Sequence, residues 1–78
     1  MSYRIYRIEK DTSRTQVEEH SGPVAATRAM LLLTAHDLKN DRTSHYYIEP
    51  ATFTSPEEIS RMEFPGWAEE ILRNEGLL

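Results

Sequence analysis

Residues 23–39, PVAATRAMLLLTAHDLK, are the one segment of this chain that is apolar and long enough to organise the rest. Within it there is no Gly and no second Pro, and Ala, Leu and Met all favour helix. Pro23 suits the first turn of a helix, after a cap at Ser21 or Gly22. Asn40 is expected to end the helix in the left-handed conformation. The segment therefore predicts a long central helix.

The apolar residues of this helix form two separate stripes. The first stripe contains Ala25, Ala29, Leu32 and Leu33, extended by Ala26 and Met30, and the second contains Val24, Leu31, Ala35 and Leu38. Two polar edges separate them: Thr27, Thr34 and Asp37 on one side, and Arg28, His36 and Lys39 on the other. A helix lying on one sheet needs only one stripe. Another element of the chain, or another molecule, must cover the second.

Length and composition limit the class of protein. Seventy-eight residues predict a single domain over 1–78, and the absence of Cys leaves a packed core to stabilise it without disulfides or thiolate metal sites. No apolar run approaches the roughly 20 residues needed to span a bilayer. The N-terminal MSYRIYRIEK lacks the apolar core of a signal peptide. We therefore expect a cytoplasmic protein without a membrane anchor.

The formal net charge of −4 is unevenly distributed. Residues 51–78 carry two Arg and six Glu, which is the whole deficit, whereas residues 1–50 are balanced. An acidic chain is a poor general binder of phosphate backbones, because such binding depends on clustered Lys and Arg.

Three segments are predicted to be strands. Residues 3–10, YRIYRIEK, repeat with period three rather than two, which indicates either a β-bulge or a sheet partly covered on both faces. Residues 15–20, TQVEEH, are expected to complete a hairpin at a sheet edge. After a loop over residues 41–44, residues 45–49, HYYIE, form the third strand, with Phe53 as a buried anchor in the connection that follows.

The C-terminal third is predicted to be helical. Ser55, Pro56 and Glu58 form a capping box that begins a short helix reaching about Met62. A final helix over about 65–75 has one apolar face, to which Trp67 is assigned as a core residue, and it ends at a left-handed Gly76. This helix is the candidate to cover the second stripe. The predicted fold is α+β: an antiparallel sheet of about three strands in β-β-α-β order, with the long helix and the C-terminal helix mainly on one face.

No residue pattern indicates catalysis, a metal or a cofactor. The three histidines, His20, His36 and His45, lie on different predicted elements without a ligand at helical spacing. The adjacent pairs 18–19, 57–58 and 69–70 of Glu diverge rather than converge on a substrate. There is no nucleophile motif and no Gly-rich phosphate loop. We therefore expect a protein that is not an enzyme.

The excess of apolar and aromatic side chains favours a small interaction or accessory module that binds a protein partner or itself as a homodimer. One variant is an inhibitor of a larger machine. The alternative is a module for single-stranded nucleic acid that uses the Tyr- and Arg-rich N-terminal hairpin. For a protein partner the candidate binding residues are Tyr3, Arg4, Tyr6, Arg7 and Tyr47. For nucleic acid the cluster consists of Arg4, Arg7, Lys10 and Arg14 beside Tyr3, Tyr6 and Tyr47.

Overall fold

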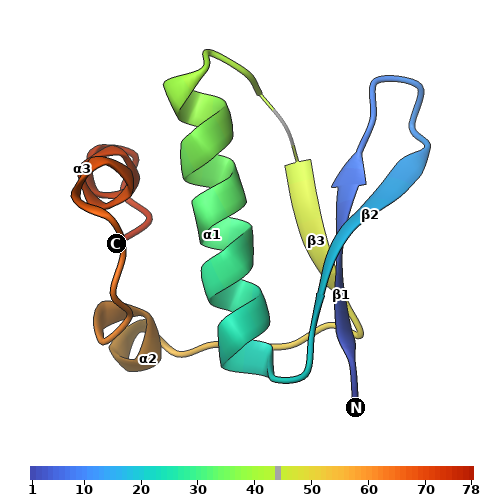
Figure 1. Ribbon diagram of the computed structural model, residues 1–78, viewed down its shortest axis with the longest axis horizontal. Coiled ribbons are helices and arrows are strands. Elements are labelled where there is room, and N and C mark those ends of the chain that lie inside the picture. Colours follow the sequence, from blue (N-terminus) through green and yellow to red (C-terminus); the bar gives the residue numbers. More distant parts are fainter. Residues whose placement is uncertain (44) are drawn as a thin grey trace.

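The computed structural model describes residues 1–43 and 45–78 and arranges them in three layers (Figure 1). The elements are β1 (Tyr3–Ile8), β2 (Arg14–His20), α1 (Pro23–Lys39), β3 (His45–Glu49), α2 (Pro56–Ser60) and α3 (Gly66–Asn74). Helix α1 stands between the sheet on one side and α2 and α3 on the other. The predicted α+β fold is therefore confirmed. The predicted loop over residues 41–44 includes Ser44, which lies outside the described residues.

The sheet is antiparallel, with strand order β2-β1-β3. Ile5 of β1 lies opposite Glu18 of β2, whereas the next residue, Tyr6, lies opposite Gln16. One residue of β2, Val17, is therefore extra, so the sheet does contain a bulge, but it lies in β2 and does not explain the period-three pattern of residues 3–10. The pairing of β1 with β3 runs on without a shift. Strand β1 thus keeps its alternation, with Ile5 turned towards α1.

The side of α1 that faces the sheet buries a carboxylate together with apolar groups. Ile5 on β1 and Ala26 on α1 are fully buried. Asp37 follows Ala26 by three helical turns and so shares its face. Its carboxylate accepts a hydrogen bond of 2.5 Å from the hydroxyl of Tyr46 on β3. Burial, and then the contact with Asp37, raise the pKa of Tyr46.

The opposite side of α1 packs against α3, as the second stripe predicts. Leu31 and Ala35 form a buried cluster with Ala68 and Leu72 of α3. Val24, at the start of the same stripe, is 40% exposed, so α3 covers the stripe from its middle onwards. Ile5 and Leu72 are the largest fully buried side chains, one on each side of α1.

Gly22 caps the start of α1 and Asn40 its end, as predicted, but Asn40 is not in the left-handed conformation. The two predicted caps further along the chain are confirmed. The Ser55 hydroxyl accepts from the Glu58 amide at 3.2 Å and donates to the Glu58 carboxylate at 3.1 Å, which completes the capping box. Gly76 has φ 75°, and the amide of Leu77 donates to the Leu72 carbonyl at 2.8 Å. Asn40, however, has φ −100°, and the left-handed residue is Asp41 with φ 54°.

Phe53 and Trp67 are not the core residues that the sequence predicts. Phe53 is 83% exposed, because its neighbour Thr54 is the residue that turns inwards. The Thr54 hydroxyl lies 2.6 Å from the hydroxyl of Thr27 on α1. Trp67 is 38% exposed, because Ala68 occupies the position on α3 that meets α1.

Candidate interaction surfaces

The face of the sheet turned away from α1 carries a pair of stacked tyrosines. Tyr6 on β1 and Tyr47 on β3 are paired residues whose ring centroids lie 5.4 Å apart at an interplanar angle of 22°. The guanidinium of Arg14, from β2, lies 4.6 Å from the Tyr6 ring centroid. It also donates to the Tyr47 hydroxyl at 2.9 Å. Among the described residues no helix lies over this face, which is called the open face below (Figure 1).

The arginines of the open face are already engaged by carboxylates. Arg14 pairs with Glu49 at 2.7 Å, and Arg4 pairs with Glu19 at 3.2 Å. The hydrogen bond to Glu19 is the main cause that raises the pKa of Arg4. Each cation therefore has one anion beside it, and the four side chains together carry no net charge.

Three of the five predicted binding residues, Arg4, Tyr6 and Tyr47, thus lie on the open face. The other two lie on the face turned towards α1. Tyr3 precedes the buried Ile5 by two residues and shares its face through strand alternation. Arg7 lies opposite Tyr46, the residue that bonds to α1, and its guanidinium pairs with Glu9 at 2.9 Å.

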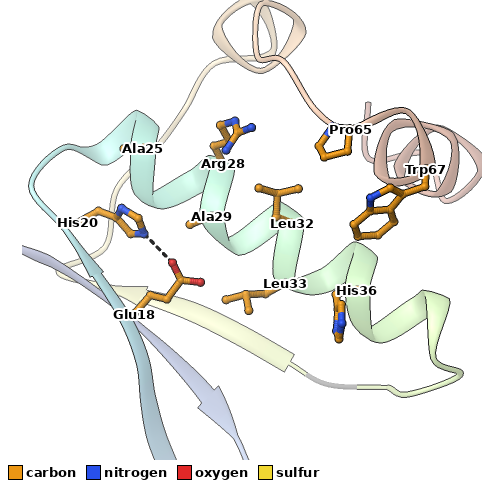
Figure 2. A pocket seen from close by; sticks show the side chains of 10 residues that line it. All are labelled: Glu18, His20, Ala25, Arg28, Ala29, Leu32, Leu33, His36, Pro65 and Trp67. Atoms are coloured by element: carbon orange, nitrogen blue, oxygen red, sulfur yellow. Dashed lines mark hydrogen bonds and ion pairs between the residues drawn. The ribbon is translucent and has the colours of Figure 1, made fainter.

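A groove of about 530 Å³ runs along α1 between the end of β2 and the start of α3 (Figure 2). Its floor is the first stripe of α1, where Ala25 is exposed, Leu32 and Leu33 are partly buried and Ala29 is buried. Figure 2 shows Leu32 directed towards Pro65 and Trp67, and Leu33 directed towards the strand that carries Glu18. The apolar residues that line the groove are Ala25, Ala29, Leu32, Leu33, Pro65 and Trp67.

Charged and titratable groups lie around this groove. Glu18 and His20, on β2, lie 3.0 Å apart and form one wall. On the α3 side, the Arg28 guanidinium lies 5.5 Å from the Phe64 ring centroid and donates to the Glu63 backbone carbonyl at 2.9 Å. Further along α1, the ammonium of Lys39 lies 4.8 Å from the ring centroid of Trp67, which lines the groove. The result is an apolar floor with cations along one rim.

The groove residues were not among the candidate binding residues predicted from the sequence. The available signal was the number of stripes: α1 has two, and α3 covers only part of one of them. Trp67 was a second signal, since a half-exposed Trp at the edge of an apolar surface is typical of interaction sites. Its exposure depends on the rotation of α3, which local sequence does not determine.

No protein-family model, curated protein or solved structure matches this chain. No helix within residues 1–43 and 45–78 has the length and apolar character to cross a membrane. In the same described part of the chain, no three His, Asp or Glu side chains converge as metal ligands. The fold and the two surfaces define a small α+β protein, and a proposal for its function rests on their geometry.

Proposed function

We propose that this protein is a small, non-catalytic interaction module that binds a protein partner through the groove along α1. The observation that carries the proposal is the partly exposed first stripe of α1 along the groove. Ala25 on the groove floor is exposed, and Trp67 on the groove wall is 38% exposed. Burial of this apolar surface by a partner would be favourable. A contiguous apolar surface with a charged rim is characteristic of association sites.

The chemistry of the groove favours binding over catalysis. Its lining contains neither a hydroxyl nor a thiol side chain that could act as a nucleophile. Glu18 and His20 contact each other at one wall, and the floor beside them is apolar. Such a floor offers shape and apolar contact to a partner, and the other imidazole of the lining, His36, has no hydrogen-bond partner among the described residues that would activate it as a base.

A pair of substitutions on adjacent residues tests this proposal. Ala25 lines the groove and is exposed, whereas Val24 precedes it on α1, is 40% exposed and does not line the groove. Ala25→Glu and Val24→Glu thus add the same charge to the same helical turn. We expect the Ala25→Glu protein to lose a partner that the wild-type and Val24→Glu proteins both capture from extracts of the native cells, measured by quantitative mass spectrometry.

Two outcomes would contradict the proposal. One is a set of captured proteins that Ala25→Glu leaves unchanged. The other is an equal loss with Val24→Glu, which would point to a general effect of charge on α1. Thermal unfolding of all three proteins confirms that each is folded, and light scattering over a range of concentrations shows whether the captured partner is a second copy of this chain.

Binding of single-stranded nucleic acid by the open face is a second candidate. The stacked pair of Tyr6 and Tyr47 favours it, because nucleobases stack on aromatic side chains exposed on a sheet. Against it, Arg4 and Arg14 are paired with carboxylates, so phosphate contacts would require these ion pairs to break. A measurable affinity for short single-stranded RNA or DNA at about 50 mM salt, lost on Tyr47→Ala, would favour the open face. Its absence would remove this candidate.

A further inference from the structure

Among the described residues, two cations on the side of α1 that borders the groove have no carboxylate partner. The ion pairs among the described residues involve Arg4, Arg7, Arg14, His20 and Arg73. Arg28 and Lys39 are absent from that set. The neighbouring segment contains Glu63 and Glu70, but neither carboxylate lies within ion-pair distance of these cations.

The positions of Arg28 and Lys39 are set by the structure. Each lies over an aromatic ring: Arg28, which lines the groove, is 5.5 Å from the ring centroid of Phe64, and Lys39 is 4.8 Å from that of Trp67, which lines the groove. They are eleven residues apart on α1, which is three helical turns and about 16 Å along the axis. Both cations therefore lie on the same side of α1, towards opposite ends of the groove.

The charge of this rim differs from the charge of the whole chain. The chain has a formal net charge of −4, yet the rim presents two cations. The carboxylate that lines the groove, Glu18, is engaged by His20 at 3.0 Å. An occupant with negative charge opposite Arg28 and Lys39 would thus complement the groove, and a basic occupant would be repelled.

The same charges disfavour a second copy of this chain as the occupant. In a symmetric dimer the same patch contributes to both sides of the interface. Two such patches would bring Arg28 and Lys39 of one copy close to the cations of the other, with only the engaged Glu18 to balance them. A partner of different composition avoids this repulsion.

The spacing of positions 28 and 39 along α1 fits a helical occupant. In a helix, two residues eleven positions apart lie on the same side, about 16 Å from each other. In an extended strand, about 16 Å corresponds to five residues, and residues five apart point to opposite faces. A helix can therefore present two acidic groups to the rim while its apolar face lies on the groove floor.

We propose that the groove binds an acidic amphipathic helix of a partner protein. Its apolar face lies on Ala25, Ala29 and Leu32, and Asp or Glu side chains three turns apart pair with Arg28 and Lys39. Trp67 packs against the occupant at the end of the groove that Lys39 occupies. This inference rests on the proposed function and adds the chemistry of the partner.

Two labelled peptides of about 18 residues, long enough for three helical turns, provide the test. They share an apolar stripe of Leu and Ala and differ only at two positions eleven residues apart, which are Glu in one peptide and Lys in the other. Fluorescence anisotropy at about 50 mM salt measures their Kd values. We expect the Glu peptide to bind about tenfold more tightly, because surface ion pairs contribute severalfold each at low salt.

Charge-removing variants of the protein complete the test. Arg28→Gln combined with Lys39→Gln is expected to weaken binding of the Glu peptide by about tenfold. Lys10→Gln combined with Arg61→Gln removes the same charge from exposed positions outside the groove and is expected to leave the Kd unchanged. Far-ultraviolet circular dichroism confirms that both double variants are folded.

Three results would overturn this inference. Equal affinity for the two peptides would remove the role of charge, while the proposed function would stand. Failure of both peptides to bind at about 1 mM would exclude an acidic helix, and the capture experiment with Ala25→Glu would then decide independently whether the groove binds any partner. Self-association that Ala25→Glu abolishes would make the occupant a second copy.

Discussion

Replacing Leu72 by Ala removes the largest fully buried side chain between α1 and α3. Leu72 is fully buried and packs in a cluster with Leu31, Ala35 and Ala68. Leu→Ala changes in cores cost about 2–5 kcal/mol, and the cost rises with the cavity that remains. Two neighbours in this cluster are already Ala and cannot expand into the space. We therefore expect the free energy of unfolding to fall by about 3 kcal/mol.

This loss is large for a chain of this size, whose total stability is expected to be about 4–12 kcal/mol. It corresponds to a decrease in Tm of about 12–24 °C. Urea and thermal unfolding, followed by circular dichroism, measure both quantities. Leu77→Ala is the matched control, because Leu77 follows the same helix and is 42% exposed; a change below about 1 kcal/mol is expected.

The packing of α3 on α1 would be refuted if Leu72→Ala cost no more than Leu77→Ala. The second stripe of α1 would then lack its cover, and the groove would lose its α3 wall. A comparison with Ile5→Ala strengthens the test, because Ile5 is the fully buried side chain on the sheet side. Both substitutions should be costly if α1 is the middle layer of the fold.

Two further substitutions test single hydrogen-bonded groups. Tyr46→Phe removes the donor to the buried Asp37 carboxylate and should cost about 1–3 kcal/mol; a neutral result in urea unfolding would show that Asp37 does not depend on this contact. Because burial and Asp37 raise the pKa of Tyr46, stability contributed by its protonated form is complete below about pH 10 and is lost as the pH rises through the folded-state pKa. Wild-type stability measured from pH 8 to 11 should therefore fall more steeply than that of Tyr46→Phe, and parallel curves would contradict this. Ser55→Ala removes the capping box of α2 and should cost about 1 kcal/mol; no loss in thermal unfolding would refute the role of the hydroxyl.

The elements that the sequence predicts correctly are those defined by local signals. Residues 23–39 combine strong helix formers with Pro23 at the start, and α1 has these bounds. The two partners of the capping box, Ser55 and Glu58, lie within a segment of four residues. Gly76 needs no distant partner to adopt its positive φ. Each of these features depends on neighbours in the chain.

The residues that the sequence misplaces depend on distant partners. Phe53 is exposed because Thr54 pairs with Thr27, a contact between segments 27 residues apart. The exposure of Trp67 follows from the rotation of α3 about its axis, which brings Ala68 against α1. In both cases hydrophobicity alone favours burial of the larger side chain. The structure instead buries the smaller neighbour, which fits the space or finds a hydrogen bond.

The sequence predicted that the protein has an apolar interaction surface, but it did not predict where that surface lies. Two stripes on α1 indicate more apolar surface than one sheet can cover, and this excess is present as the groove. Which stripe α3 covers depends on the path of the connection after β3, where local signals are weak. The candidate binding residues were instead placed mainly on the N-terminal hairpin, because Tyr and Arg are common in binding sites. Binding of a partner or of nucleic acid by the open face stays a prediction.

The most direct test of helix binding by the groove is to locate the bound peptide on the protein surface. Amide chemical shifts of isotope-labelled protein, recorded while the Glu peptide is added, report which residues contact it. We expect chemical-shift changes along one side of α1 at residues 25–36, at the end of β2 and around Trp67. Shifts concentrated at Tyr6 and Tyr47 on the open face, with the groove unchanged, would contradict it.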